Sequence, residues 1–368
     1  MSTRREFLGT AASALAGIAF VGCDLLTSAP ARAQPRRREV VVNGKRAKVV
    51  DMHAHCAVPE AMALMGMKLG TPGPATRSDL SMVTHVSERL RAMDEQGIDV
   101  ETLSINPYWY KADRDLARQL IQLQNEKLAE ACAAHPDRFV AFGTVALQHP
   151  DLAAEQLEQA VRKYGLRGAA IGGSVNGEEI SDPKFHPFWA KAEQLGVVVF
   201  IHPQGAGVAT EIPNRFKGNG LLDNVIGNPL ETTIALSHLI FEGTLDRFPG
   251  LKICAAHGGG YLPSYAARSD RGCLTQPTRC PGGEFGSIKK KPTEYLKQMY
   301  YDTMVFTPEG LRHLAAEVGA DRLVIGTDFP YPWTKTAVNH VLETPGLSDA
   351  DRVAILGGTA AKLLGIKA

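Results

Sequence analysis

Two histidines stand two positions apart at the end of an apolar stretch, in the segment VVDMHAHC. In a β-strand, side chains at that spacing point to the same face, so His53 and His55 would lie side by side. Two imidazole nitrogens placed in this way could bind one metal ion. A strand-end histidine also often bonds only a neighbouring carbonyl, so a metal site requires further ligands elsewhere in the chain.

Three further candidate ligands or proton carriers follow apolar stretches later in the chain. They are His202 in GVVVFIHP, His257 in LKICAAHGG and Asp328 in DRLVIGTDFP. Because only 11 of the 368 residues are histidines, four of them at the ends of apolar stretches are hard to ascribe to chance. Imidazole nitrogens together with a carboxylate suit one divalent ion in an open catalytic site, with zinc the first choice and manganese or iron the alternatives.

The elements that must position these residues recur regularly along the chain. Eight apolar stretches are strand candidates, at residues 47–55, 99–107, 138–147, 166–174, 196–203, 251–259, 299–306 and 321–330. Helical patterns such as DLARQLIQLQNEKLAEACAAH, with apolar residues at three- and four-residue steps, separate most of them. This alternation predicts an α/β fold, the (β/α)8 TIM barrel, whose catalytic residues gather at the C-terminal ends of the strands.

An open doubly wound sheet is the alternative fold for alternating strands and helices. That fold normally carries a glycine-rich phosphate-binding turn after its first strand, where this chain has HAHC. The barrel is therefore expected over residues 47–368, preceded by a hairpin and linker at residues 34–46 that turns at Asn43-Gly44. The loop-rich stretch 56–84 after the first strand is expected to form a cap-like insertion over the barrel mouth.

Residues 1–33 have the pattern of an export signal and stand apart from the fold. Paired Arg4 and Arg5 precede a run of small apolar residues, and the A-x-A pattern in APARAQ predicts cleavage before Gln34. Arginine pairs of this kind are typical of twin-arginine signals, so we expect a periplasmic protein that uses the twin-arginine export machinery. An N-terminal membrane helix and lipid anchoring at Cys23 are the weaker alternatives.

Net charge and cysteine content limit the possible partners. The formal net charge is +1, which gives no reason to expect nucleic acid or an anionic membrane as a partner. None of the six cysteines forms a C-x-x-C pair, so a thiolate zinc site is not expected. Cys273 and Cys280 flank a short loop and could form a disulfide in an oxidising compartment, or remain free thiols.

The motifs DMHAH, IHP, AHGGG and GTDFPYP occur in this order, and together they resemble the amidohydrolase superfamily. The chain is most similar to its aminocarboxymuconate-semialdehyde decarboxylase branch, over roughly residues 47–366, with RLRAMDEQGIDV and ILGGTAAKLLGI matching near the two ends. The resemblance implies that four residues bind one divalent ion and that His257 is the acid–base beside the metal-bound water. The implied ligands are His53, His55, His202 and Asp328, the last of which also belongs to the catalytic set.

The fourth strand candidate bears on the number of metal ions. Amidohydrolases with two metal ions carry a bridging carboxylated lysine on that strand, and GAAIGGS contains no lysine. We therefore expect one ion per chain, as in the decarboxylase branch.

The same resemblance implies two arginines that hold the substrate carboxylate. Arg77 and Arg268 match these positions, and the planar guanidinium suits a carboxylate because it can form two parallel hydrogen bonds. In this branch the second arginine reaches the neighbouring subunit's site, so we expect a homodimer with Arg268 acting in trans. The chain departs from the branch after IHP, where Gln204 replaces a tryptophan, which puts the exact substrate in doubt.

These features predict a metal-dependent decarboxylase, a carbon–carbon lyase that acts on a small unsaturated or aromatic carboxylic acid. The alternative is a metal-dependent hydrolase of a lactone, amide or ester, or a hydratase, at the same site. A catalytically silent binding protein is disfavoured because every expected ligand is present.

Overall fold

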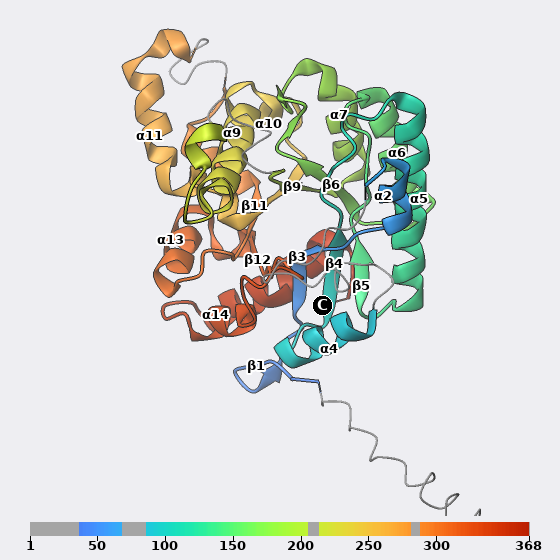
Figure 1. Ribbon diagram of the computed structural model, residues 1–368. Helices are drawn as coiled ribbons and strands as arrows, with labels where there is room; N and C mark the ends of the chain where they lie inside the picture. The colour runs from blue at the N-terminus through green and yellow to red at the C-terminus, as the bar shows by residue number, and fades with distance from the viewer. Residues whose placement is uncertain (1–36, 68–85, 205–212, 281–287, 368) are drawn as a thin grey trace, which may run out of the picture. The chain divides into compact units, whose positions relative to one another are not determined.

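Eight parallel strands form the centre of the fold in the computed structural model, which describes residues 37–67, 86–204, 213–280 and 288–367 (Figure 1). Each strand lies within one of the eight apolar stretches. The strands are β3 (Val50–His55), β4 (Val100–Ser104), β5 (Phe139–Ala141), β6 (Gly168–Gly172), β9 (Val198–His202), β10 (Lys252–Ala255), β11 (Tyr300–Asp302) and β12 (Leu323–Val324).

The strands close into a barrel in the order of the sequence. One parallel run joins β3, β4 and β5, and a second joins β6, β9, β10, β11 and β12. Isolated parallel bridges connect the two runs, from Gly143 to Ala169 on one side and from Asp51 to Ile325 on the other. The eight parallel strands therefore close on themselves, and the predicted (β/α)8 barrel is confirmed.

Helices follow the strands and cover the outside of the barrel. The α-helices are α2 (Pro59–Leu64), α4 (Val86–Gln96), α5 (Arg114–Ala134), α6 (Pro150–Arg162), α7 (His186–Leu195), α9 (Asn228–Phe241), α10 (Thr244–Arg247), α11 (Leu262–Thr275), α12 (Pro292–Tyr295), α13 (Pro308–Val318), α14 (Ala337–Glu343), α15 (Asp349–Val353) and α16 (Thr359–Leu364). Shorter 3₁₀ or π turns are η1 (Pro183–Phe185), η2 (Pro213–Phe216), η3 (Asp223–Gly227), η4 (His257–Gly259), η5 (Pro277–Arg279), η6 (Leu296–Gln298), η7 (Ala320–Arg322) and η8 (Ala354–Gly358).

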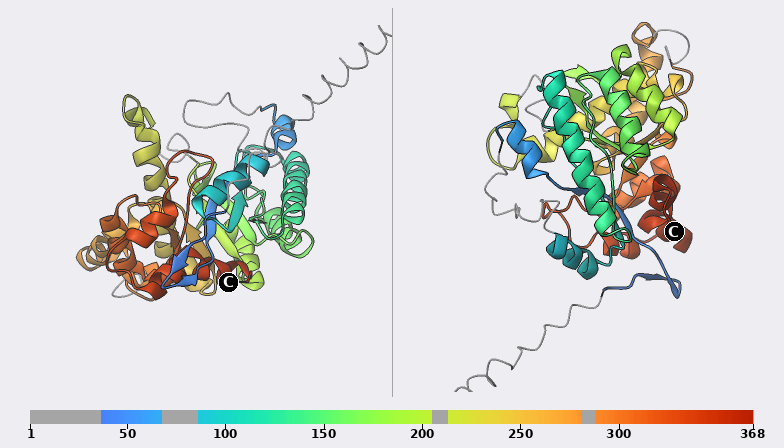
Figure 2. Two further views of the ribbon diagram at one scale, coloured as in Figure 1. Left: turned by 90° about the horizontal axis from the view of Figure 1, so that it is seen from below. Right: turned by 90° about the vertical axis from the view of Figure 1, so that its right-hand side faces the viewer.

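Local sequence accounts for the ends of these helices. Asp113 caps α5 by accepting a hydrogen bond from the backbone N–H of Leu116 at 2.9 Å. Gly196 ends α7 in the left-handed conformation, which glycine adopts at little cost. Figure 2 shows α5, α6 and α7 packed side by side along one side of the barrel. Within the described residues, none of the helices is both long and apolar enough to cross a bilayer.

The barrel interior is filled by its own hydrophobic cluster, which includes Met52, Phe142 and Phe200 from the strands. Leu363 and Leu364 of α16 belong to the same cluster, so this C-terminal helix contributes to the core inside the strands. A larger cluster fills the layer between the strands and the surrounding helices. The interior is therefore a packed core, and chemistry is confined to the strand ends.

Two hairpins sit outside the barrel strands. The expected one pairs β1 (Val41–Val42) with β2 (Lys45–Arg46), and both turn residues have positive φ, as an Asn-Gly turn of type I′ requires. The second pairs β7 (Ser174–Val175) with β8 (Glu178–Glu179) and was not predicted.

The cysteines of the described residues fall into two groups. Cys273 at the end of α11 is joined to Cys280 by a disulfide, so the paired alternative holds. Cys56, Cys132 and Cys254 are free thiols.

Candidate metal and acid–base site

Four imidazole rings meet at the C-terminal ends of the barrel strands. His53 and His55 end β3, His202 ends β9, and His257 follows β10. The ring centroid of His53 lies 4.9 Å from that of His55, 5.1 Å from that of His202 and 5.1 Å from that of His257. The structure therefore brings together all four histidines that the sequence singled out.

Asp328, beyond β12, places its carboxylate against these rings. Oδ1 of Asp328 lies 2.8 Å from Nε2 of His55 and 3.2 Å from Nε2 of His53, and Oδ2 lies 3.8 Å from Nε2 of His257. One ligand atom each from His53, His202, His257 and Asp328 lie within 4.8 Å of one another, close enough for one metal ion. This group contains His257, which the sequence assigned to acid–base chemistry.

Hydrogen bonds at the far side of two rings determine which nitrogen of each faces the site. Nδ1 of His53 lies 2.6 Å from the carboxylate of Asp302, which can only accept, so Nδ1 carries the proton. Nδ1 of His55 lies 3.1 Å from Oγ of Ser104, whose own hydrogen is donated to the carbonyl of Ala54. Both Nε2 atoms therefore present lone pairs to the site, as ligands oriented by such partners do.

When both rings are neutral, as metal ligands are, the arrangement has acceptors but no donor between them. The two Nε2 atoms of His53 and His55 lie 3.0 Å apart and face the same carboxylate oxygen of Asp328. Among the described residues, neither nitrogen of His202 has a hydrogen-bond partner, although its side chain is buried. Lone pairs that converge in a buried space repel one another unless a cation lies between them, so these residues fit a divalent metal ion.

The pKa shifts of the site residues also indicate that the site favours a positive charge. Burial lowers the pKa of His53, but Asp328 and Asp302 outweigh burial and raise it to about 10, so in the absence of a metal ion this ring itself carries the positive charge. Burial raises the pKa of Asp328, but His53 and its neighbours lower it by more, to well below its usual range. Burial and then His55 and His53 keep the pKa of His202 well below the usual value, which leaves that ring neutral and its lone pair available.

Backbone and side-chain contacts tie the two strands that carry ligands. The N–H of Asp328 donates to the carbonyl of His53 at 2.8 Å. The buried carboxylate of Asp51 accepts hydrogen bonds from the N–H of His53 at 3.0 Å and from the hydroxyl of Thr327 at 2.5 Å. The ligands on β3 and after β12 therefore move as one unit.

A buried arginine supports the same region from α4. Arg89 forms an ion pair with Glu101 at 2.7 Å and donates to the carbonyl of His55 at 2.5 Å. Its guanidinium also lies over the ring of Phe329, 4.7 Å from the ring centre. The arginine thus links the end of β3 and the start of β4 to the loop that begins with Asp328.

His257 is held by its backbone. Asp302, which orients His53, also accepts hydrogen bonds from the N–H groups of His257 and Gly258, both at 2.9 Å. His257 and Asp328 both have left-handed backbone conformations, with φ of 54° and 59°, which cost a side-chain-bearing residue about 1 kcal/mol. Gly260 follows with φ of 67°, where a Cβ atom would lie 2.1 Å from the carbonyl oxygen of Pro229.

Asp302 is the functional residue that the sequence reasoning missed. It is fully buried, ends β11 and connects a candidate ligand with the candidate acid–base. The available signal was a carboxylate at the end of a strand candidate, in MYYDTMVF, the position that had identified the other site residues.

A cavity of about 600 Å³ opens beside the histidines. His257 and Asp328 are the cluster members that line it, and most of its remaining wall is apolar. The apolar side chains are Val225, Pro229, Met304, Val305, Phe306 and Trp333. Its size and lining suit a small molecule with an apolar body whose reacting group lies against His257.

The expected substrate-binding arginines stand outside this cavity or outside the described residues. Arg268 lies on α11, as expected for a helix that begins near His257, and its side chain is exposed. Arg77 lies outside the described residues. Gln204, the departure from the branch, is held in place because its N–H donates to Glu231 at 3.0 Å and its side-chain amide donates to the carbonyl of Pro107 at 3.1 Å.

The chain is similar to known decarboxylases in sequence and in structure. The chain is 30% identical over 283 residues to 2-amino-3-carboxymuconate-6-semialdehyde decarboxylase of Dictyostelium discoideum, covering 76% of each chain. It is 30% identical over 329 residues to gamma-resorcylate decarboxylase of a Rhizobium species, covering 86% of this chain and 97% of the relative. A crystal structure of dihydroxybenzoic acid decarboxylase from a Polaromonas species, with bound manganese and the inhibitor 2-nitroresorcinol, is 27% identical. It superposes with a TM-score of 0.73, covering 87% of this chain and 97% of that one.

The family described as Amidohydrolase matches residues 50–366, nearly the whole barrel. The resemblance inferred from DMHAH, IHP, AHGGG and GTDFPYP is confirmed, and the chain belongs to the amidohydrolase family.

Proposed function

We propose that this protein is a metal-dependent carboxy-lyase that decarboxylates an aromatic or unsaturated carboxylic acid. The observation that carries the proposal is the convergence of unprotonated nitrogens and a carboxylate beside an apolar cavity, with His257 on the cavity wall. The decarboxylases among the relatives support this chemistry over hydrolysis.

The ligands we assign to the metal ion are His53, His55, His202 and Asp328. His257 also lies within reach, but it lines the cavity where substrate would bind, whereas His55 is not part of that lining and its Nε2 lies 2.8 Å from Asp328. The bound ion supplies a fixed positive charge that holds a substrate oxygen and stabilises negative charge developing on it. With three nitrogens and a carboxylate as ligands, zinc is the ion we propose; the Polaromonas structure makes manganese the competitor.

The protein's own groups account for the proton and the orientation of the substrate. His257 delivers a proton to the carbon that carries the carboxylate, and the bond between that carbon and the carboxylate then breaks with release of CO₂. The apolar wall formed by Met304, Phe306 and Trp333 holds the ring or diene and excludes water from it. Asp302 keeps His257 in place through its backbone N–H.

The test combines a substrate screen with two matched variants. Purified protein is supplied with zinc or manganese, and hydroxybenzoic and dienoic acids are screened for CO₂ release. His257→Asn should keep one ion per chain and lose about 10²-fold or more in rate, whereas His55→Asn should lose the ion as well. Hydrolysis of esters or lactones without CO₂ release, or loss of the ion from His257→Asn, would contradict the assignment.

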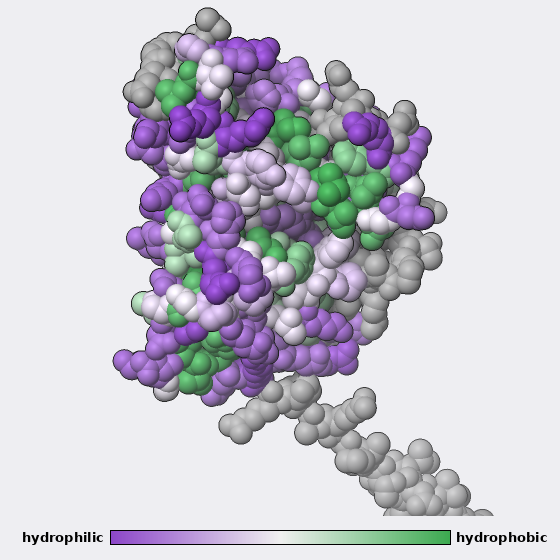
Figure 3. Space-filling model, turned by 90° about the vertical axis from the view of Figure 1, so that its left-hand side faces the viewer, coloured by the Kyte–Doolittle hydropathy of each residue, from purple (hydrophilic) through white to green (hydrophobic). Residues whose placement is uncertain are grey.

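We further propose a homodimer in which Arg268 of one subunit, together with Arg77 of the other, holds the substrate carboxylate. The exposed position of Arg268 on α11 and its absence from the lining of its own cavity support this arrangement. Tyr265 and Leu274 on the same helix expose apolar side chains. Figure 3 looks onto the side that carries α11, α13 and α14 and shows apolar patches among hydrophilic residues.

For the cellular location we propose twin-arginine export to the periplasm, with residues 1–33 as the signal. The disulfide between Cys273 and Cys280 supports an oxidising compartment, because such bonds rarely persist in the cytosol. Replacing Arg4 and Arg5 by lysine should keep the protein in the cytoplasm, as measured by cell fractionation. Unchanged periplasmic activity in that variant would refute the proposal.

A further inference from the structure

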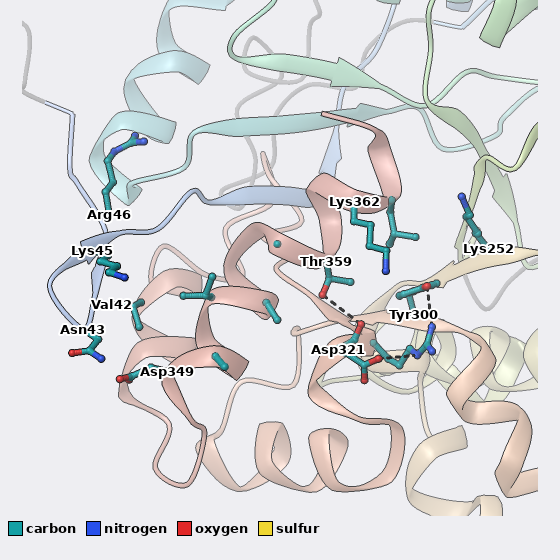
Figure 4. A pocket seen from close by; sticks show the side chains of 16 residues that line it. Val42, Asn43, Lys45, Arg46, Lys252, Tyr300, Asp321, Asp349, Thr359 and Lys362 are labelled. Carbon is teal, nitrogen blue, oxygen red and sulfur yellow. Dashed lines mark hydrogen bonds and ion pairs between the residues drawn. The ribbon is translucent and has the colours of Figure 1, made fainter. Parts of the chain in front are cut away.

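A second cavity lies at the opposite end of the strands from the histidines. Its volume is about 730 Å³, and Lys252 and Tyr300, the first residues of β10 and β11, contribute to its wall. The β1–β2 hairpin, η7, α15, η8 and α16 supply the rest (Figure 4). Because barrel chemistry takes place at the C-terminal strand ends, this basal cavity is separate from the decarboxylase site.

Positive charge is in excess around the basal cavity. Its charged lining residues are the cations Lys45, Arg46, Lys252, Arg322 and Lys362 and the carboxylates Asp321 and Asp349. Arg46 is already paired with Asp99 at 2.7 Å. The cations that remain around the strand starts come from three different elements, β10, η7 and α16, so the fold rather than one sequence motif brings them together.

Lys252 is held in position by the backbone. Its Nζ donates to the carbonyl oxygen of Gly196 at 2.6 Å, at the C-terminal end of α7. An ammonium group has three hydrogens to donate, so this bond fixes the charge and leaves further donors available to another acceptor.

Arg322 and Tyr300 form a second fixed donor pair. The guanidinium donates to the hydroxyl oxygen of Tyr300 at 2.9 Å and stacks over the same ring at 5.1 Å. Because the phenol oxygen accepts this bond, its own hydrogen is free for an acceptor in the cavity. Figure 4 shows Lys362 of α16 extending into the cavity toward the same hydroxyl.

The neighbouring carboxylate does not neutralise these charges. Asp321 lies 3.5 Å from Arg322, and its side chain is 73% exposed, so water screens the pair. Among the described residues, no carboxylate pairs with Lys362. Lys252, Arg322 and Lys362 therefore leave an excess of positive charge on the cavity wall, which a bound anion would reduce.

We propose that Lys252, Tyr300, Arg322 and Lys362 form a basal site for a phosphate-type oxyanion with two negative charges. The anion would accept hydrogen bonds from the two ammonium groups, the guanidinium and the phenol, and so connect α16 to the starts of β10 and β11. Val42, Val353 and Leu363 line the same cavity and leave room for the organic part of a phosphate monoester.

The test is calorimetric titration of the metal-loaded, full-length protein with inorganic phosphate at constant ionic strength. Lys362→Gln and Tyr300→Phe should each weaken binding about tenfold or more, since each removes one donor to a charged group. Lys163→Gln is the matched control and should leave the affinity unchanged, because this exposed lysine follows α6 and does not line the basal cavity. Turnover should be the same in all three variants.

Phosphate could also bind at the metal ion, and the variants separate the two locations. If Lys362→Gln and Tyr300→Phe bind phosphate as tightly as the unmodified protein, the anion binds elsewhere and the basal site is refuted. Absence of saturable binding refutes it as well. A parallel titration with glycerol 3-phosphate identifies the source of the anion, because tighter binding than phosphate indicates a monoester and equal binding indicates the free ion.

Discussion

At the scale of single residues, the site depends on groups that never touch the metal ion. Asp302 holds the ring of His53 at 2.6 Å and the backbone of His257 at 2.9 Å, so one carboxylate positions both a proposed ligand and the proposed acid–base. Ser104 does the same for His55 alone. Partners of this kind typically change metal affinity or activity by 10–100-fold when removed.

We therefore predict that Asp302→Asn lowers metal affinity by about 10–100-fold, because an amide can donate to Nδ1 of His53 and so favour the wrong tautomer. The measurement is competition for the metal with a chelator of known affinity. Asp246→Asn is the matched control, since Asp246 also accepts a hydrogen bond from a buried group, the hydroxyl of Tyr295, but lies far from the site in the fold. Equal metal affinity of Asp302→Asn and the unmodified protein would show that Asp302 has no role in positioning His53.

At the scale of elements, closely packed strands require glycine at positions that the hydrophobic pattern of the sequence does not identify. Gly168 begins β6 with φ of 147°, and a Cβ atom there would lie 1.9 Å from the carbonyl oxygen of Val198 in β9. Gly165, three residues earlier, also has positive φ, 69°, but has open space around it. The two glycines therefore separate the effect of backbone conformation from that of crowding.

Gly168→Ala should lower the free energy of unfolding by about 3 kcal/mol or more, because it adds a clash between β6 and β9 to the cost of a strained backbone. Gly165→Ala should cost only about 1 kcal/mol, the conformational cost alone. Denaturant unfolding followed by circular dichroism measures both. Equal destabilisation by the two substitutions would mean that the strands can move apart to accept a methyl group.

The sequence predicted the existence of the strands better than it predicted their ends. All eight strand candidates contain a strand, because buried parallel strands are continuous apolar runs. Their ends were placed too far out, most of all for β12, where only Leu323–Val324 of the stretch 321–330 is regular strand. The rest of that stretch pairs with β3 only through isolated bridges at Ile325 and Phe329, and Asp328 between them faces the histidines, a local function that periodicity does not encode.

Two other features of the structure were not predicted from the sequence, for different reasons. The β7–β8 hairpin turns at Asn176-Gly177, a dipeptide as strong as the Asn43-Gly44 signal that was used, and its flanking strands are only two residues each. The four imidazoles were placed at one mouth by the barrel hypothesis, but the 4.8 Å cluster that contains His257 depends on a left-handed backbone that the sequence alone does not specify.

At the scale of the whole molecule, the proposed dimer makes each site depend on two subunits. Arg268 lies on the exposed part of α11, which begins at Leu262. Over the residues from Tyr261 to Arg268 a helix rises about 10 Å, which carries the guanidinium from the mouth toward the rim. From the rim, the guanidinium of Arg268 could extend into the site of a partner subunit.

Co-expression of His257→Ala and Arg268→Ala, each inactive alone, should restore about a quarter of normal activity. With random pairing about half the dimers are mixed, and in each of these one of the two sites has both residues intact. The quarter applies to the unseparated mixture. Purification through two different tags proves that mixed dimers are present and should raise the activity to about half, because one of the two sites in each mixed dimer is intact. No recovery in such dimers would place Arg268 in its own subunit's site or outside catalysis.

The left-handed backbone at His257 and Asp328 lowers the stability of the fold, whereas the two side chains at these positions serve the proposed reaction. Glycine at either position would relax the chain, and at Asp328 asparagine would be tolerated nearly as well, so heat resistance alone favours losing the groups that do the chemistry. A library of this protein selected only for survival at high temperature should accumulate glycine at positions 257 and 328 and yield robust, inactive barrels. Directed evolution of this enzyme therefore has to score product formation in every round, because a thermal screen by itself leads away from catalysis.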